Sequence, residues 1–364
     1  MKISDVILQL ENLAHPSLQE SYDNCGLITG NELAECTGIL VALDATEAVI
    51  AEALMKGCNM VVVHHPIVFS GLKKITGKNY VERTVIAAIK KEIAIYAIHT
   101  NLDNVLQGVN SRIAEKLELT DCRILLAKNS TLKKLITYVP VDYLDKVRDA
   151  VFSAGGGTTG NYAECSFVAT GTGSFKANKE ADPFVGEVGE RHYEKEAKLE
   201  VVFEAWKEKQ LLNALIKSHP YEEVVYDIIS IGNVDRQTGS GIIGELDKSV
   251  DEMAMLEKIK KEFGLAVIRH TPLRNKKIKR VAVCGGAGSF LIKSAIAAGA
   301  DLYITADIKY HEFFDAEGQV VLADIGHYES EQFTIDLLAD FLENKFPTFA
   351  VLKTGVKTNP VQYY

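Results

Sequence analysis

Short apolar runs alternate with helical patterns in the two outer thirds of this sequence. The apolar runs are Gly38–Asp44, Met60–His64, Ile93–Ile98, Arg280–Cys284, Asp301–Thr305, Val320–Ile325 and Phe349–Lys353. Helical patterns lie between them, among them Tyr80–Lys91, Phe290–Ala298 and Tyr328–Leu342. Continuous apolar strands separated by helices predict a parallel sheet covered on both faces, and therefore an α/β fold.

The middle of the chain has a different pattern. Its strands are longer and alternate between apolar and polar residues, as in Leu199–Glu204, and its helical patterns lie at Val141–Ala154 and Glu208–His219. This order is compatible with a β-α-β-β-α-β domain inserted between two halves of an α/β unit. We therefore predict two core lobes, residues 1–126 and 238–364, and an insert of residues 127–237.

The composition is that of a folded protein of two or three domains. The chain has 364 residues, of which 47% are hydrophobic and 24% charged, and this excludes wholesale disorder. The net charge of -9 argues against a nucleic-acid partner. No stretch approaches the roughly 18 apolar residues of a membrane helix. Asp5 and Glu11 interrupt the N-terminal apolar pattern, so we expect no signal peptide, no membrane partner and a cytoplasmic location.

The six cysteines are scattered and form no CxxC pair, which argues against a zinc finger. In a long chain without a signal peptide, disulfides are not expected either. We interpret these cysteines as small buried hydrophobic residues.

Two adjacent histidines, His64 and His65, end the apolar run Val61–His65, and Pro66 follows them. Neighbouring side chains of a strand point to opposite faces, so both imidazoles reach one site only if the backbone turns here, at the carboxyl end of the strand. Open α/β sheets bind ligands at that end. The alternative is one core histidine and one surface histidine.

Two further motifs also fall at predicted strand ends. His327 and Glu331 are four residues apart, the spacing that places two side chains on one face of a helix. The alternative there is a charge pair at a helix start. Asp103 follows the strand Ile93–Ile98 and is either a metal ligand or a helix cap.

Together these motifs offer three imidazoles and two carboxylates. This set suits a divalent metal such as Zn²⁺, Fe²⁺ or Mn²⁺. With bridging carboxylates, five ligands could hold two ions about 3.5–4 Å apart, as in two-metal hydrolytic sites.

The segment Cys284–Ser289 (CGGAGS) is rich in glycine and lies between a predicted strand and a predicted helix. Its backbone amides either cradle an anion or form only a tight turn. It matches neither GxGxxG nor GxxxxGK[ST], which excludes the dinucleotide and P-loop interpretations.

Seven segments of the outer thirds resemble the Nif-three-like family, whose bacterial members are often labelled GTP cyclohydrolase 1 type 2 homologues. The matching segments are Tyr22–Gly30, Ala42–Ile50, Val61–Phe69, Ile98–Asn104, Val281–Ser289, Leu302–His311 and Gly326–Glu331. The resemblance implies a two-lobed α/β core with a dinuclear metal site between the lobes. The family's ligands correspond here to His64, His65, Asp103, His327 and Glu331.

The resemblance also implies a homohexamer, built as a trimer of dimers. The middle region is similar to the PII/CutA-like ferredoxin fold of longer bacterial members, with Ser218–Ile228 resembling a CutA-type segment. His99 and Asp307 are candidates for orienting the ligands, or are structural.

Two function classes remain open. The first is a metal-dependent hydrolase of GTP cyclohydrolase 1 type 2 kind, acting on GTP, a related nucleotide or a phosphorylated small molecule. The second is a non-catalytic, oligomeric metal-binding regulator or interaction platform.

Overall fold

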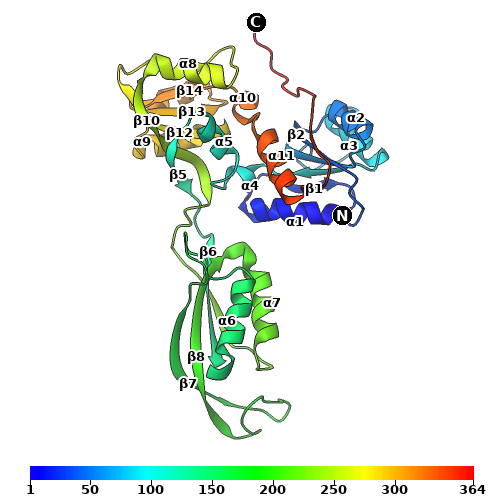
Figure 1. Ribbon diagram of the computed structural model, residues 1–364, viewed down its shortest axis with the longest axis vertical. Helices are drawn as coiled ribbons and strands as arrows, with labels where there is room; N and C mark the ends of the chain where they lie inside the picture. The colour runs from blue at the N-terminus through cyan, green and yellow to red at the C-terminus, as the bar shows by residue number, and fades with distance from the viewer. The chain divides into compact units, whose positions relative to one another are not determined.

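The computed structural model describes residues 1–364, which divide into two compact units (Figure 1). Unit 1 joins Met1–Ala127 to Gln237–Tyr364, and unit 2 is the segment Lys128–Arg236 between them. The mixed α/β fold contains three sheets, two in unit 1 and one in unit 2.

The first sheet of unit 1 has the strand order β1-β4-β3-β2-β15. Strands β2, β3, β4 and β15 are parallel, whereas β1 runs antiparallel to β4 at the edge. The elements of this lobe are α1 (Ile3–Leu13), η1 (Pro16–Leu18), β1 (Gly26–Thr29), β2 (Ile39–Asp44), α2 (Glu47–Met55), β3 (Met60–His65), α3 (Tyr80–Lys90), β4 (Ala94–Ala97), α4 (Thr100–Asp103), α11 (Thr334–Lys345) and β15 (Val351–Lys353).

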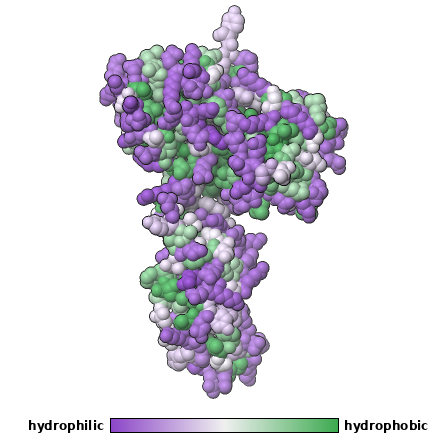
Figure 2. Space-filling model, viewed as in Figure 1, coloured by the Kyte–Doolittle hydropathy of each residue, from purple (hydrophilic) through white to green (hydrophobic).

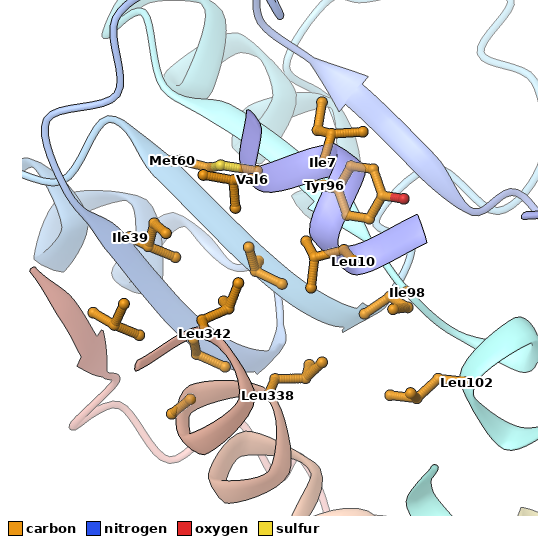
Figure 3. Packing of buried hydrophobic residues seen from close by; sticks show 14 of the residues in the cluster. Val6, Ile7, Leu10, Ile39, Met60, Tyr96, Ile98, Leu102, Leu338 and Leu342 are labelled. Carbon is orange, nitrogen blue, oxygen red and sulfur yellow. The ribbon is translucent and has the colours of Figure 1, made fainter. Parts of the chain in front are cut away.

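Alternate residues of these strands pack into two separate hydrophobic cores, one on each face of the sheet. Ile39, Met60 and Tyr96 face α1 and α11, as Figure 3 shows. Their neighbours along the strands, such as Leu40 and Val61, face α2 and α3 on the opposite side (Figure 1). Because both faces of the sheet are covered, its strands are apolar at nearly every position, which confirms the covered sheet predicted from the sequence.

The second sheet of unit 1 has the strand order β11-β14-β13-β12-β10-β5. Only β12, β13 and β14 are parallel, so the sheet is mixed rather than wholly parallel as the sequence pattern predicted. Its elements are α5 (Val109–Lys116), β5 (Thr120–Ala127), β10 (Gly239–Asp251), α8 (Glu252–Glu262), β11 (Arg269–His270), β12 (Lys277–Ala287), η4 (Ser289–Leu291), α9 (Ile292–Ala297), β13 (Leu302–Ala306), η5 (Tyr310–Ala316), β14 (Val321–Asp324) and α10 (His327–Glu331).

Two local predictions in this lobe were wrong. Strand β12 continues through Cys284 to Ala287, so most of the glycine segment belongs to the strand. The helix expected over Tyr328–Leu342 is divided into α10 and α11. At the break, the Gln332 side-chain amide donates to the Glu329 carbonyl at 3.0 Å.

Unit 2 contains one antiparallel sheet with the strand order β7-β8-β6-β9. Its elements are β6 (Leu132–Pro140), η2 (Val141–Tyr143), α6 (Leu144–Ser153), β7 (Phe167–Lys176), β8 (Arg191–Glu204), η3 (Ala205–Lys207), α7 (Glu208–Ser218) and β9 (Tyr226–Ser230). Both helices pack on one face of the sheet, against residues such as Leu199 and Phe203 (Figure 1). Helices therefore cover only one face of this sheet.

All six cysteines are unpaired, and three of them, Cys36, Cys58 and Cys284, are buried. No helix is long and apolar enough to cross a membrane. On the face seen in Figure 2, hydrophobic residues form small groups among hydrophilic ones.

The packing of α1 can be tested with two leucines of the same helix. Leu10 is fully buried against the sheet, as Figure 3 shows, whereas Leu8 is 56% exposed. We expect Leu10→Ala to lower the free energy of unfolding by about 2–5 kcal/mol, because it leaves a cavity. Leu8→Ala serves as the matched control and should change it by less than about 0.5 kcal/mol. Urea unfolding followed by circular dichroism measures both, and equal effects would contradict the packing.

Candidate metal centre

Five side chains singled out from the sequence converge inside unit 1. His64 and His65 lie at the carboxyl end of β3, and Asp103 ends α4, just beyond β4. His327 and Glu331 are the first and last residues of α10, which follows β14 of the other sheet. The two sheets therefore both contribute, and the ends of their strands position the side chains.

The first group of candidate donor atoms joins His64, Asp103 and Glu331. His64 Nε2 lies 3.6 Å from Asp103 Oδ1 and 3.8 Å from Glu331 Oε1. His64 Nδ1 lies 2.8 Å from the Ile98 carbonyl oxygen, which can only accept, so Nδ1 carries the proton and donates. In the neutral ring, Nε2 then presents a lone pair towards the two carboxylates.

Two atoms of this group lack any hydrogen-bond partner although they are buried: His64 Nε2 and Asp103 Oδ1. Buried polar atoms are rarely left unpaired, because each costs about 1–3 kcal/mol. A lone pair and a carboxylate oxygen that face each other without a donor between them are typical of a cation site. This pair is the strongest indication of a ligand in the centre.

The second group joins His65, His327 and Glu331. Glu331 Oε2 lies 2.9 Å from His65 Nε2 and 3.1 Å from His327 Nε2, and the two nitrogens are 3.3 Å apart. Glu331 thus belongs to both groups: its Oε1 faces the first group, and its Oε2 faces the second. Its side chain is only 3% exposed.

Each histidine of the second group is held by a carboxylate on its other nitrogen. His65 Nδ1 donates to Asp44 Oδ1 at 2.7 Å, and His327 Nδ1 donates to Asp307 Oδ2 at 2.6 Å. Such contacts fix the orientation of the ring and make the remaining nitrogen more basic. The contact of Asp307 agrees with the orienting role considered from the sequence.

Asp44 was missed as a functional residue by the sequence reasoning. It ends β2 and is the register partner of His65 on the neighbouring parallel strand β3. The Thr358 hydroxyl also donates to its carboxylate. An acidic residue at the end of a strand adjacent to the His64–His65 strand is the signal that could have identified it.

His99 lies beside His64 and His65, and their ring nitrogens form a third group of candidate donors. Its Nδ1 donates to Asp23 Oδ1 at 2.8 Å. Burial acts to raise the pKa of Asp23, but hydrogen bonds from His99 and Thr100 outweigh it and hold that pKa well below its usual range. His99 therefore directs Nε2 towards the centre while Asp23 fixes its Nδ1 proton.

The glycine segment Cys284–Ser289 leaves space for the Glu331 carboxylate of the candidate metal centre. Gly286 has φ +62°, and a Cβ there would lie 2.3 Å from Glu331 Oε1. Its amide donates to Ser330 Oγ, and the amide of Gly285 donates to Asn110 Oδ1. Because both amides are already used, they do not form the anion cradle considered from the sequence.

The spacing and chemistry of these donors fit divalent metal ions. Donor atoms around a tetrahedral zinc ion lie about 3.3–3.4 Å apart, given bonds of about 2.0–2.1 Å. The 2.9–3.3 Å distances among His65, His327 and Glu331 are close to this value. The first group, at 3.6 and 3.8 Å, is slightly wider.

Without a cation, protons must occupy part of the centre. Burial acts to lower the pKa of His65, but hydrogen bonds to Asp44 and Glu331 raise it to about 9. Similar bonds to Asp307 and Glu331 outweigh burial at His327 and raise its pKa to about 11. Burial and the neighbouring Glu331 raise the pKa of Asp103 to about 7. Cations that bind here therefore compete with protons.

A cavity of about 710 Å³ opens beside the candidate donors. His65, His99, Asp103, His327 and Glu331 all line it. Its wall also contains several aromatic side chains and one arginine: Tyr22, Phe69, Phe290, Tyr328, Tyr363 and Arg269. A small organic molecule would fit within this volume.

Two sheets whose strand ends share a partly buried cluster of histidines and carboxylates define an α/β protein with a candidate metal centre. A model of the family Duf34/NIF3 (NGG1p interacting factor 3) matches residues 1–360. The chain therefore belongs to the NIF3 family, which confirms the resemblance noted in the sequence.

Several relatives cover the whole length or most of it. A Staphylococcus epidermidis protein named GTP cyclohydrolase 1 type 2 homolog is 34% identical over 370 residues, 100% of each chain. A Bacillus subtilis protein of the same name is 39% identical over 310 residues, 84% of this chain and 83% of the relative. The crystal structure of a Bacillus cereus protein related to NIF3 has a TM-score of 0.87 and 31% identity, covering 100% of this chain and 99% of that one.

The contact between Asp44 and His65 gives a pH-dependent prediction for the metal-free protein. The pKa of His65 is raised from 6.5 to about 9, so protonated His65 stabilises the folded state. This contribution to the free energy of unfolding is fully present below pH 6.5. This contribution is lost as the pH rises through about 9. We expect Asp44→Asn to lower the pKa of His65, because it removes a negatively charged acceptor, and to make metal affinity about 10–100-fold weaker.

NMR titration of the His65 ring and competition with a chelator measure these two effects. Asp315→Asn is the matched control, since it removes the same charge from an exposed position. Equal effects of the two variants would show that the contact with Asp44 does not control His65.

Proposed function

We propose that unit 1 binds two divalent metal ions and acts as a metal-dependent hydrolase of GTP cyclohydrolase 1 type 2 kind, with GTP or a related nucleotide as substrate. The proposed ligands are His64, His65, Asp103, His327 and Glu331. The observation that carries the proposal is the pair of buried, unpartnered atoms His64 Nε2 and Asp103 Oδ1. The names of the relatives support the substrate class.

The donor groups suggest how two ions would be divided. His64 and Asp103 would hold one ion, and His65 and His327 the other. Glu331 would contribute a ligand atom to each, because its two oxygens face different groups. Imidazole and carboxylate donors suit Zn²⁺, Fe²⁺ or Mn²⁺.

Divalent ions supply Lewis acidity and lower the pKa of water, which is what hydrolysis at neutral pH requires. The chain's own residues would bind the substrate and move protons. His99 is suited to accept a proton at Nε2, since its Nδ1 donates to Asp23 Oδ1 at 2.8 Å. Tyr22, Phe69 and other aromatic side chains of the cavity offer faces on which a purine could stack.

We further propose that the protein is a homohexamer, a trimer of dimers, and that unit 2 is a ferredoxin-like domain of PII/CutA kind. The second part is supported by the β-α-β-β-α-β order and by the strand order β7-β8-β6-β9. As an inserted domain, unit 2 would extend over about residues 127–237, between the two core segments of residues 1–126 and 238–364.

Metal content tests the ligand assignment. We expect the wild-type protein to bind two equivalents of metal per chain. Asp103→Asn and His327→Ala should each lose about one equivalent, whereas Glu331→Gln should weaken both sites because it is shared. Elemental analysis after equilibration with Zn²⁺, Mn²⁺ or Fe²⁺ measures the stoichiometry. The exposed His311→Ala is the control, and a wild-type protein that stays metal-free would refute the proposal.

Turnover of GTP tests the reaction. We expect formate release that chelator abolishes and added metal restores. His99→Gln should lower kcat about 10²–10⁴-fold at unchanged metal content if His99 transfers a proton. Cys284→Ala should leave turnover largely intact. Fully metal-loaded protein that converts no nucleotide would instead favour the non-catalytic regulator.

A further inference from the structure

We propose that unit 2 carries a second ligand site, a pocket that binds a small organic ammonium ion. A cavity of about 750 Å³ lies entirely within this unit, and its size is that of small-molecule sites. None of the metal-centre residues lines it. The proposal is therefore independent of the function proposed for unit 1.

The pocket lies on the face of the sheet that the helices leave uncovered. Ala197 and Leu199 of β8 are buried on the helical side. Their neighbours Glu196 and Lys198 alternate with them and line the pocket, together with Tyr138 of β6. The hairpin of β7 and β8 thus forms its floor.

Glycines in β7 make the hollow, and Glu196 lies within it. Gly171 is the register partner of Glu196, and a Cβ built on Gly171 would meet no atom within 4 Å. A Cβ on Gly173 would lie 2.0 Å from Glu196 Oε2, so the carboxylate lies across that glycine. The Tyr221 hydroxyl donates to Glu196 Oε1 at 2.9 Å and fixes the carboxylate in place.

The negative charge of Glu196 is not neutralised by a basic side chain of the chain. Lys198, two residues further along β8, pairs instead with Glu200 at 2.6 Å. Two more carboxylates, Glu222 and Glu223, also line the pocket. Lys176 also lines the pocket, so three carboxylates face two lysines, one of which is paired with Glu200. The lining keeps a small excess of negative charge, which favours a cation over a phosphate or carboxylate ligand.

Aromatic rings form the walls around this carboxylate. The ring centroids of Phe175 and Phe184 both lie 6.2 Å from that of Tyr221. Aromatic faces attract alkylammonium groups, and each favourable contact contributes about 0.5–2 kcal/mol. A carboxylate held by Tyr221, in a pocket that three rings line, therefore favours an organic ammonium ion, whose alkyl groups contact the rings.

Binding of choline, propylammonium and putrescine to the full, metal-loaded chain tests the proposal by calorimetry. The uncharged 3,3-dimethyl-1-butanol has nearly the shape of choline and serves as the ligand control. We expect at least one of the three cations to bind, and where choline binds, the alcohol should bind at least about 10-fold more weakly.

Two variants address the pocket in different ways. Glu196→Gln keeps an acceptor for Tyr221 but removes the charge, and we expect it to weaken binding at least about 10-fold. Gly171→Val fills the hollow without altering any charge and should abolish binding. Glu187→Gln removes the same charge outside the pocket and is the matched control.

Circular dichroism and metal content should be unchanged in all three variants. The proposal is overturned if none of the three cations binds. It is also overturned if choline and its uncharged analogue bind equally, or if Glu187→Gln weakens binding as much as Glu196→Gln. Metal content that stays constant throughout separates these results from a failure of the metal centre.

Discussion

The arrangement of unit 1 depends on the buried carboxylate of Glu331. Its oxygens face His64 on one side and both His65 and His327 on the other, and no lysine or arginine pairs with it. Burying a carboxylate is strongly unfavourable unless positive charge accompanies it. Protonated histidines meet this demand in the metal-free chain, and divalent cations would meet it better, since they also satisfy His64 and Asp103.

The need to accommodate the buried charge of Glu331 accounts for several features of the surrounding fold. Gly286 leaves space for the carboxylate, and its amide is tied to Ser330 of the same short helix that carries Glu331. Asp44 and Asp307 hold the histidine rings from behind. Two sheets with separate cores thus both contribute to one polar cluster at the ends of their strands.

Unit 2 differs from the first sheet of unit 1, because helices cover only one face of its sheet. The other face carries charged side chains in alternation, and the hollow at Gly171 and Gly173 interrupts it. Unit 2 thus has its own core and its own pocket, and none of the candidate metal ligands lies in it. Such a separation is suited to regulation of an enzyme, and equally to a protein that only senses its ligands.

The sequence by itself determined the covered strands and the strand ends at which His64, Asp103 and His327 lie, because apolar periodicity and helical spacing are local properties. The assignment of β5 to the second sheet and of β15 to the first crosses the predicted division of the core into residues 1–126 and 238–364. The sequence did not determine which strands run antiparallel, the course of Cys284–Ala287 within β12, or the role of Asp44. These depend on which strands pair and in what register, and so on contacts between residues distant in the chain. Only the tertiary structure placed Asp44 beside His65 and one carboxylate between three imidazoles, since burial of that charge is decided by both lobes together.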